Sequence, residues 1–360
     1  MKVLYISKAL VVAAYRSKLQ DLGSGASVTG VVPRRWGRQP VEQSENDGHI
    51  HFADALFHGQ NHLHLYPRLS AILADVQPDI VHIDEEPYSL VTLQAARLCR
   101  KRDIPAVFFA WQNLNKRLPP PFGRVRRAVF ESVAGGIAGT DTAANVLREA
   151  GFNGALTVVP QFGVDPAVFQ PRKQTSADSI TVGYGGRLVN EKGVDILLRA
   201  VAQQPGVNLS IAGDGPAKPR LLKLATELHI TDRVVFRGHM RSLDMPSWLQ
   251  TIDVLALPSR ATPAWAEQFG RILVEAMACG IPVIATRSGE IPNVVQDGGL
   301  LIGENDVTGL RAGIELLARD PELRLKLGTA GRARVLAHYT NERIAFYSLA
   351  FYQQIMAGCA

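Results

Sequence analysis

Short apolar segments alternate with amphipathic helical segments along almost all of the 360 residues. This rhythm is typical of parallel sheets that are covered by helices on both faces. In the first half, strands are expected at Val3–Ser7, Val28–Val32, Ile80–Ile83, Ala106–Ala110, Gly136–Ala138 and Thr157–Val159. In the second half, they are expected at Ile180–Tyr184, Val207–Ala212, Val234–Phe236, Val254–Leu257, Val283–Ala285 and Leu300–Ile302. The sequence therefore predicts an α/β protein with two Rossmann-like, doubly wound domains that face each other across a cleft.

Helices are expected between these strands, and they end where Gly, Pro or polar residues interrupt the periodicity. Their expected ranges are Pro67–Asp75, Tyr88–Lys101, Gly123–Ser132, Ala143–Ala150, Gly193–Gln203, Lys218–His229, Ser242–Gln250, Gly270–Cys279, Val307–Ala318 and Pro321–Ala337. The histidine-rich stretch His49–Leu65 gives only a weak signal. Gly183, Gly185 and Gly186 do not have the spacing of a Gly-x-Gly-x-x-Gly motif, which argues against a dinucleotide site.

A polar stretch without periodicity, Phe169–Ser179, indicates a linker between the two halves. We therefore expect a first domain at residues 1–170, a second at 171–338, and a C-terminal helix within 339–360. This last helix, predicted at Asn341–Met356, is rich in Phe and Tyr. It either packs back on the first domain and ties the two together, or extends the second.

The composition is that of a globular protein, with 46% hydrophobic and 20% charged residues. No apolar run approaches the roughly 18 to 20 residues of a membrane span. The cysteines Cys99, Cys279 and Cys359 are odd in number and scattered without metal-type spacing, which fits a reducing compartment. These features predict a cytoplasmic protein.

Positive charge is concentrated in one part of the chain, which has a formal net charge of +6. Between residues 97 and 127 only Asp103 opposes the cations Arg97, Arg100, Lys101, Arg102, Lys116, Arg117, Arg124, Arg126 and Arg127. This stretch is either a solvated face or a contact for an anionic membrane surface or a phosphate-bearing acceptor. Nucleic acid is excluded, because the aromatic residues are too few and too irregular for base stacking.

The segment Glu267–Pro292, EQFGRILVEAMACGIPVIATRSGEIP, combines two carboxylates with the start of a helix. Pro263 and Gly270 indicate that Glu267 lies in the preceding loop and that only Glu275 is helical. The apolar neighbours of Glu275 predict that its carboxylate has a dedicated partner. Helix N-termini attract phosphate, and carboxylates accept hydrogen bonds from sugar hydroxyls. The segment is therefore suited to hold a nucleotide sugar.

Two further constellations follow strands of the second half. In GYGGRLVNEKG, Arg187 offers a planar fork of donors and Lys192 a point charge, which together suit a diphosphate, although an ordinary helix start is the alternative. In AGDG, the turn around Gly213 either contacts a base or ribose or is only a tight turn.

The motifs GGRLVNEKG, SIAGDGP, VVFRGH, DVLALPS, EQFGRILVEAMACGIPVIAT and SGEIPNVV occur in this order over roughly residues 180–295. In this order they resemble the donor-binding domain of family 4 retaining glycosyltransferases with the GT-B fold. The first half resembles the family through PDIVHIDEEPYSL, AGTDTAANVLREAGF and PQFGVDPAVFQP. The resemblance implies transfer of a sugar from a nucleoside diphosphate sugar, UDP- or GDP-linked, to an acceptor hydroxyl.

The resemblance also implies roles for single residues. Arg187 and Lys192 would bind the diphosphate, Glu267 would contact the sugar, and Glu275 would accept from ribose hydroxyls. Other residues would line the donor site, some through backbone N–H groups: Gly186, Gly213, Phe269, Gly270, Ser288, Gly289 and Glu290. The chain contains no Asp-x-Asp motif, so neither a metal nor a further cofactor is expected.

The acceptor side is less defined. Many relatives carry a His after the strand that here ends in Trp111, Gln112 and Asn113, and this chain has none there. Glu85 and Glu86 are the nearest acidic candidates, unless they cap the following helix. The acceptor would be a sugar, a polysaccharide or a lipid-linked molecule. Alternatives to the transferase are a non-catalytic sugar-nucleotide-binding or assembly protein and an epimerase of the same fold.

Overall fold

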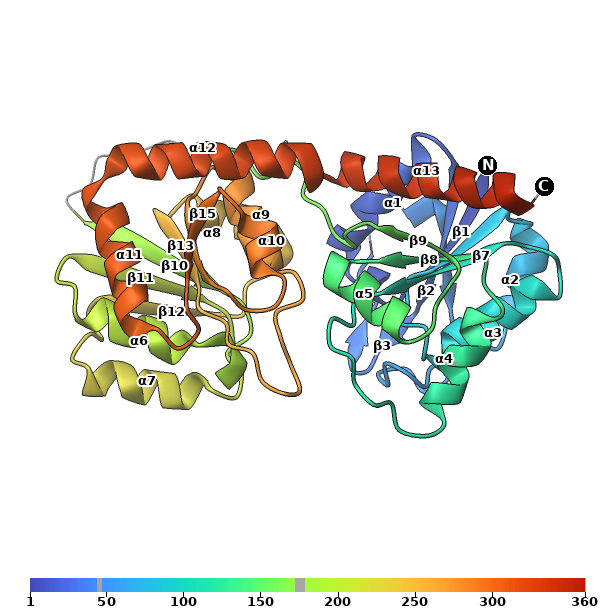
Figure 1. The fold of residues 1–360 in the computed structure, drawn as a ribbon, viewed down its shortest axis with the longest axis horizontal. Coiled ribbons are helices and arrows are strands. Elements are labelled where there is room, and N and C mark those ends of the chain that lie inside the picture. The colour runs from blue at the N-terminus through green and yellow to red at the C-terminus, as the bar shows by residue number, and fades with distance from the viewer. Residues whose placement is uncertain (44–46, 172–178, 360) are drawn as a thin grey trace. The chain divides into compact units, whose positions relative to one another are not determined.

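The computed structural model describes residues 1–43, 47–171 and 179–359. Contacts between residues divide the chain into two compact units: unit 1 is Met1–Gly163 with Asn341–Ala360, and unit 2 is Val164–Thr340. Each unit contains a parallel sheet with helices on both sides (Figure 1). The predicted class, α/β with two Rossmann-like domains, is confirmed.

The main sheet of unit 1 is parallel throughout, in the order β5-β2-β1-β6-β7-β8-β9. Its strands are β1 (Lys2–Ile6), β2 (Ser27–Pro33), β5 (Ile50–Ala53), β6 (Ile80–Ile83), β7 (Ala106–Ala110), β8 (Gly135–Ala138) and β9 (Ala155–Val158). A separate antiparallel pair is formed by β3 (Arg35–Trp36) and β4 (Gln39–Pro40).

The helices of unit 1 include one that comes from the end of the chain. They are α1 (Ser17–Gly23), α2 (Leu69–Val76), α3 (Leu90–Arg100), α4 (Phe122–Phe130), α5 (Asp141–Glu149) and α13 (Asn341–Cys359). Short 3-10 turns cover Ala9–Val11, Ala13–Arg16 and Asp47–His49. Helix α13 packs on α1, and its buried Tyr352 hydroxyl lies 2.6 Å from Nδ1 of the buried His82 on β6.

The sheet of unit 2 has the order β12-β11-β10-β13-β14-β15, which is the Rossmann order. Its strands are β10 (Ile180–Gly185), β11 (Val207–Ala212), β12 (Val234–Gly238), β13 (Val254–Leu257), β14 (Val283–Thr286) and β15 (Gly299–Ile302). Its helices are α6 (Val194–Ala202), α7 (Lys218–Glu227), α8 (Met245–Leu249), α9 (Arg271–Ala278), α10 (Ile291–Val295), α11 (Val307–Arg319) and α12 (Pro321–His338), with 3-10 turns at Asn190–Lys192 and Ser242–Asp244.

The predicted strands at Ile80–Ile83, Ala106–Ala110, Val207–Ala212 and Val254–Leu257 have the predicted bounds. They are central strands covered on both faces, so most of their residues are apolar, and Ala106–Ala110 and Val254–Leu257 are uninterrupted apolar runs. Strand β5 was missed in the histidine-rich stretch, because it is an edge strand that is only partly buried. Helix α1 was missed as well: its packing on α13 stabilises a seven-residue helix with little periodicity of its own.

The division by contacts falls at Gly163, earlier than the expected boundary at 170. The residues from 164 to 170 belong to unit 2. Val164 N donates to Tyr339 O at 3.0 Å, and Arg332 Nη1 donates to Phe169 O at 3.1 Å. Most of the predicted linker at 169–179 lies outside the described residues. Among the helices of the described ranges, none combines the length and apolar character needed to cross a membrane.

Glycines 193 and 280 provide a matched test of packing in unit 2. Both adopt left-handed backbone angles, φ +66° and +68°. A Cβ on Gly193 would lie 2.0 Å from the carbonyl oxygen of Pro258, whereas one on Gly280 would meet nothing within 4 Å. We expect Gly280→Ala to cost about 1 kcal/mol of stability and Gly193→Ala about 2 to 4 kcal/mol. Thermal and urea unfolding would measure both, and equal losses would contradict the packing argument.

Candidate functional site

The sheet of unit 2 reverses its strand order between β10 and β13. In open parallel sheets, ligands bind beyond the carboxyl ends of the strands at such a reversal. The chain leaving β10 carries Arg187 and Lys192, and the chain leaving β13 carries Glu267. The topology thus brings the three residues predicted to handle phosphate and sugar to the same edge of one sheet.

Lys192 and Glu267 form an ion pair at this edge, with Nζ 2.5 Å from Oε2. Ser259 Oγ donates to the same carboxylate oxygen at 2.9 Å. The side chains of Lys192 and Glu267 are 19% and 8% exposed, so solvent screens their attraction less than that of a surface pair. The predicted phosphate-binding lysine and the predicted sugar-contacting glutamate therefore lie side by side.

The backbone after β10 is held against the loop after β13. Lys192 ends a 3-10 turn, and Gly193 passes so close to Pro258 that only glycine fits. In the same place Arg260 N donates to Glu191 O at 2.8 Å. These contacts fix the backbone of the two loops that carry the ion pair.

The loop after β14 packs on the backbone of Glu267. Glu290 N donates to Glu267 O at 2.9 Å, and a Cβ on Gly289 would lie 2.1 Å from that oxygen. The Glu290 carboxylate accepts a hydrogen bond from Asn293 Nδ2 at 3.0 Å. Ser288 Oγ is buried and has no hydrogen-bond partner among the described residues. An unsatisfied buried hydroxyl costs free energy, so Ser288 is suited to bond a ligand.

Glu275 is helical and Glu267 lies in the preceding loop, as the positions of Pro263 and Gly270 predicted. Glu275 has a dedicated partner, as its apolar neighbours predicted: the partner is Arg271, whose Nε lies 2.7 Å from Oε1. Burial raises the pKa of Glu275, and Arg271 partly offsets this effect. Gly270 is the N-cap residue of α9, with φ +73° and no side-chain cap. The buried Phe269 ring packs edge-on to Tyr339 at 5.6 Å.

Arg187 follows β10 with an exposed side chain, and its carbonyl oxygen accepts from the Tyr184 hydroxyl at 3.0 Å. Burial, together with the charge of Glu267, raises the pKa of Tyr184 far above its usual value. A Cβ on Gly213 would lie 1.9 Å from Gly186 O, so packing between two loops already requires glycine there. Gly186 and Gly213 are thus brought together at the edge where Arg187 lies.

Unit 1 has its own strand-order reversal, between β1 and β6. Ser7 Oγ donates to Asp84 at 2.7 Å, and Lys8 Nζ pairs with Glu85, whose side chain is 1% exposed. Burial would raise the pKa of Asp84, but the Lys18 charge and the hydrogen bonds it accepts hold it below its usual value. For Glu85, burial prevails over Lys8 and its pKa is raised. Charged groups are therefore concentrated at this edge too.

Glu86 turns away from Glu85 and toward the end of β7. Its Oε1 accepts from the backbone N–H groups of Trp111 and Gln112 at 2.8 and 3.1 Å. Its Oε2 is buried without a hydrogen-bond partner among the described residues. Burial raises the pKa of Glu86 to about 7. The alternative that Glu85 and Glu86 cap the next helix is wrong, because α3 begins at Leu90 with Ser89 at its N-cap.

Trp111 serves the packing of unit 1 as well as the anchoring of Glu86. A Cβ on Gly139 would lie 2.4 Å from its indole carbons, so the ring lies flat against that glycine. Its Nε1 donates to Gln161, which in turn donates to Asp84 at 2.6 Å. Trp111, Glu86 and Asp84 thus belong to connected parts of one polar network in unit 1.

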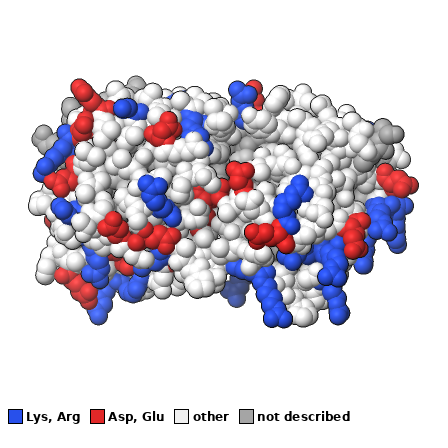
Figure 2. All heavy atoms as spheres, in the orientation of Figure 1, with Lys and Arg blue, Asp and Glu red and all other residues white. Residues whose placement is uncertain are grey.

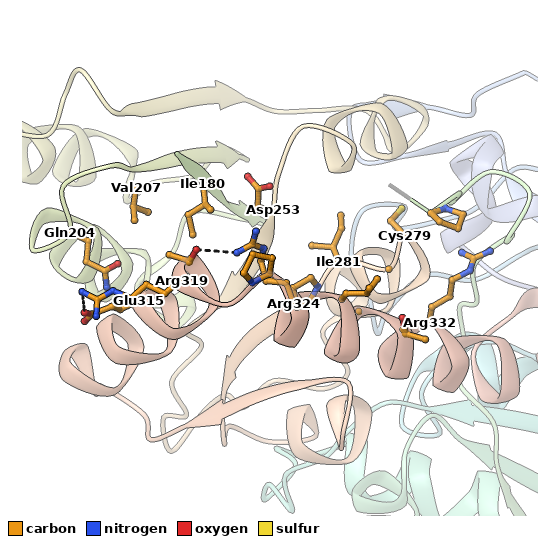
Figure 3. A pocket seen from close by; sticks show the side chains of 18 of the residues that line it. Ile180, Gln204, Val207, Asp253, Cys279, Ile281, Glu315, Arg319, Arg324 and Arg332 are labelled. Carbon is orange, nitrogen blue, oxygen red and sulfur yellow. Dashed lines mark hydrogen bonds and ion pairs between the residues drawn. The ribbon is translucent and has the colours of Figure 1, made fainter. Parts of the chain in front are cut away.

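A cavity of about 1190 Å³ in unit 2 lies away from these residues, beside the first residues of β10 and β11 and between them and α11 and α12 (Figure 3). Arg311 and Arg319 both pair with Glu315, at 3.3 and 2.7 Å. Arg324 and Arg332 donate to backbone carbonyls. Because the arginines are engaged in holding helices, this cavity is a poor anion site, and none of the predicted site residues lines it.

Sequence reasoning missed Lys8, Ser259 and Trp265. Ser259 and Lys8 each follow a strand that ends at the reversal point, which is the signal that could have found them. Trp265 stands in the loop before Glu267, and the Lys192 ammonium lies 5.0 Å from its ring centre. Within residues 1–43, 47–171 and 179–359, no cluster of three or more His, Cys, Asp or Glu is arranged to hold a metal ion.

Two family profiles match the chain. One is described as glycosyl transferases group 1 and matches residues 168–334, and the other as glycosyltransferase family 4 and matches residues 14–168. The chain belongs to the family 4 glycosyltransferases, and the GT-B fold predicted from the resemblance is confirmed.

Individual relatives agree with this assignment. The lipopolysaccharide core biosynthesis glycosyltransferase LpsE of Rhizobium meliloti is 30% identical over 271 residues, which cover 71% of this chain and 77% of LpsE. A D-inositol 3-phosphate glycosyltransferase of Mycobacterium marinum is 38% identical over 172 residues, but these span 44% of this chain and only 36% of that relative. The structure of Anabaena Alr3699/HepE in complex with UDP and glucose shares the fold, with a TM-score of 0.77 at 20% identity over 98% of this chain and 100% of that one.

Glu86 predicts a specific pH dependence of stability. The pKa of Glu86 is about 7 in the folded protein and 4.5 in the unfolded chain. Its contribution to the free energy of unfolding is therefore fully present below about pH 4.5 and is lost as the pH rises through 7. Glu86→Gln stays neutral and keeps an oxygen for both N–H groups. Its stability relative to the wild type should therefore rise by at least about 1 kcal/mol between pH 5 and pH 8. Urea unfolding at both pH values measures this, with the exposed Glu149→Gln as control; a pH-independent difference would contradict the burial argument.

Proposed function

We propose that the protein is a retaining glycosyltransferase that moves a sugar from a nucleoside diphosphate sugar, UDP- or GDP-linked, to an acceptor hydroxyl. The observation that carries this proposal is the Lys192–Glu267 pair at the strand-order reversal of unit 2. A cation for phosphate and a carboxylate for sugar hydroxyls are what such a donor requires. The UDP and glucose bound in the Anabaena structure support a nucleotide-sugar donor for this fold.

In this proposal Arg187 and Lys192 bind the diphosphate, Glu267 contacts the transferred sugar and Glu275 accepts from the ribose. The remaining donor contacts come from Gly186, Gly213, Phe269, Gly270, Ser288, Gly289 and Glu290. The orphaned hydroxyl of Ser288 supports its role, since a donor group would satisfy it. The exposed guanidinium of Arg187 supports its role, since it is open to a ligand at that edge.

The chemistry begins with cleavage of the bond between the anomeric carbon and the leaving phosphate oxygen. The acceptor oxygen then bonds to the same face of that carbon, and the leaving phosphate oxygen takes the acceptor's proton. The products are a nucleoside diphosphate and a glycosylated acceptor with retained anomeric configuration. Arg187, Lys192 and backbone N–H groups stabilise the charge that develops on the phosphate. Neither a metal nor a further cofactor enters this scheme.

Glu85, Glu86 and Trp111 are proposed for the acceptor side. Glu86 supports this best, because its Oε2 is buried without a partner in the described structure and would accept from a hydroxyl. The name of the Rhizobium relative supports a sugar, polysaccharide or lipid-linked acceptor in cell-surface polysaccharide or glycoconjugate synthesis. A sugar-nucleotide-binding protein without turnover, or an epimerase, is the competing function.

Donor turnover tests this proposal. Release of nucleoside diphosphate from a panel of UDP-, GDP- and ADP-sugars, together with thermal shifts, would identify the donor. Arg187→Ala and Lys192→Ala should each lower turnover at least about 100-fold, because they remove charge stabilisation worth about 2.7 to 4 kcal/mol. The exposed Lys223→Ala on α7 is the matched control. Unchanged turnover in both site variants would refute the assignment of Arg187 and Lys192 to the diphosphate. Tight donor binding without turnover in the wild type would favour a sugar-nucleotide-binding protein that is not an enzyme.

We also propose that the protein acts in the cytoplasm at the inner face of the membrane. Figure 2 shows Lys and Arg gathered along the lower edge of unit 1, where α4 lies. The exposed cations of α4 and of the loop before it, here called the basic face, are Lys116, Arg117, Arg124 and Arg127. Arg97, Arg100, Lys101 and Arg102 are also exposed, at the end of α3 and just after it. The exposed prolines at 119–121 and the half-buried Leu118 and Phe122 lie between its cations in sequence. Such a mixture of cations and apolar groups suits an anionic lipid surface.

Vesicle sedimentation tests the membrane proposal. The triple variant Arg117→Glu, Arg124→Glu and Arg127→Glu should bind phosphatidylserine-containing vesicles at least about 10-fold less well than the wild type, since each surface cation is worth about 1 kcal/mol. The matched control carries the same reversal at Lys223, Arg237 and Lys326 of unit 2. Binding that persists in neutral vesicles, or that both triples lose equally, would contradict a contact through this face.

A further inference from the structure

Trp265 lies beside the ion pair of unit 2, on the loop that joins β13 to α9. The Lys192 ammonium is 5.0 Å from the centre of its ring, and the same nitrogen is 2.5 Å from Glu267 Oε2. Trp265 is half-buried, unlike Trp248 in the same unit, which is 4% exposed and donates its Nε1–H to Ser210 at 2.9 Å. Trp265 is thus less buried than Trp248, and its ring lies next to the ion pair of Lys192 and Glu267.

The first residues of the Trp265 loop are tied down by contacts with three other segments of unit 2. Ser259 O accepts from Thr286 Oγ1 on β14. The Arg260 guanidinium pairs with Asp195 of α6. The next residue, Ala261, donates its backbone N–H to the Glu304 carboxylate at 3.0 Å. The loop is therefore anchored before it reaches the tryptophan.

The turn that carries Trp265 is closed by hydrogen bonds of its own. Thr262 N donates to Trp265 O at 2.7 Å, and Trp265 N donates back to Thr262 O at 3.2 Å. Thr262 Oγ1 accepts from Ala264 N and Trp265 N at 3.3 and 3.0 Å. This closed turn holds the backbone that directs the ring, so a ligand that used the ring would find it pre-organised.

An aromatic face beside a carboxylate matches the two kinds of surface on a pyranose ring. One face of the sugar presents C–H groups with partial positive charge, which lie favourably on the negative face of an indole. The hydroxyls at the edge donate to a carboxylate. We propose that Trp265 is the platform on which the transferred sugar stacks, and that it sets the preference for the donor sugar over the free nucleotide. This inference rests on the proposed donor site.

Two other tasks for the ring give different results in a binding experiment. If Trp265 only holds Lys192 through a cation–π contact, its loss weakens binding of the diphosphate with or without a sugar. If Trp265 stacks on the nucleobase, its loss likewise weakens binding of both the free nucleotide and the nucleotide sugar. Stacking on the sugar affects only the donor that carries one. The ratio of the Kd values for a nucleotide and its sugar conjugate therefore separates these roles.

Calorimetric titration with UDP and UDP-glucose, and with GDP and GDP-mannose, is the experiment. Trp265→Leu should raise the Kd of the preferred nucleotide sugar about 3- to 10-fold, as expected for a lost stacking contact. The Kd of the matching free nucleotide should change less than about 2-fold. Trp265→Phe, which keeps an aromatic face, should recover part of the loss. Lys192→Ala is the comparison that should weaken both ligands.

Equal weakening of both ligands by Trp265→Leu, or no change in either, would overturn the stacking role while leaving the donor site intact. A wild-type protein that binds none of the four nucleotides would overturn the proposed function and this inference together. Thermal midpoints of the variants would show whether each is folded. Trp265→Phe keeps the test decisive if the leucine variant does not fold.

Discussion

The ion pair between Lys192 and Glu267 joins the two loops on which the candidate site of unit 2 is built. One loop leaves β10 and the other leaves β13, and these strands are neighbours where the strand order reverses. Ser259 bonds the carboxylate of Glu267, and the loop at 288–290 bonds its backbone. Because both charges are largely buried, each is stabilised by the other. Much of the site is therefore centred on one glutamate.

Unit 1 repeats this arrangement with different residues. Lys8 follows β1 and pairs with Glu85, which follows β6, and these strands also meet at a reversal of strand order. The shared cause is topological: parallel strands bring their carboxyl ends to one edge, and the reversal leaves space between the helices there. Charged side chains placed in that space are partly desolvated, so they pair. Both units of this chain thus carry charged groups at corresponding positions.

The sequence was sufficient for the fold class, for most strands and helices, and for the separate settings of Glu267 and Glu275. Central strands were predictable because burial on both faces leaves an uninterrupted apolar run, as in Val254–Leu257. Even the partner of Glu275 is local, since Arg271 lies one helical turn before it. What escaped prediction depends on distant contacts: β5 lies at a sheet edge, and α1 is stabilised by α13 from the other end of the chain.

The sequence by itself determined the alternation of strands and helices, the glycines at tight approaches, and the residue types suited to phosphate and sugar. Only the tertiary structure decided which of these residues meet. Lys192 and Glu267 are 75 positions apart, and Trp265 joins them through a turn that local periodicity does not reveal. The tertiary structure also separates Glu85 from Glu86, although they are adjacent in sequence. Glu85 pairs with Lys8, whereas Glu86 accepts from the backbone just after β7. Hydrophobic periodicity indicates which face of a helix or strand a residue lies on. Which distant side chains pair with one another depends on strand order and on the cost of burying charge.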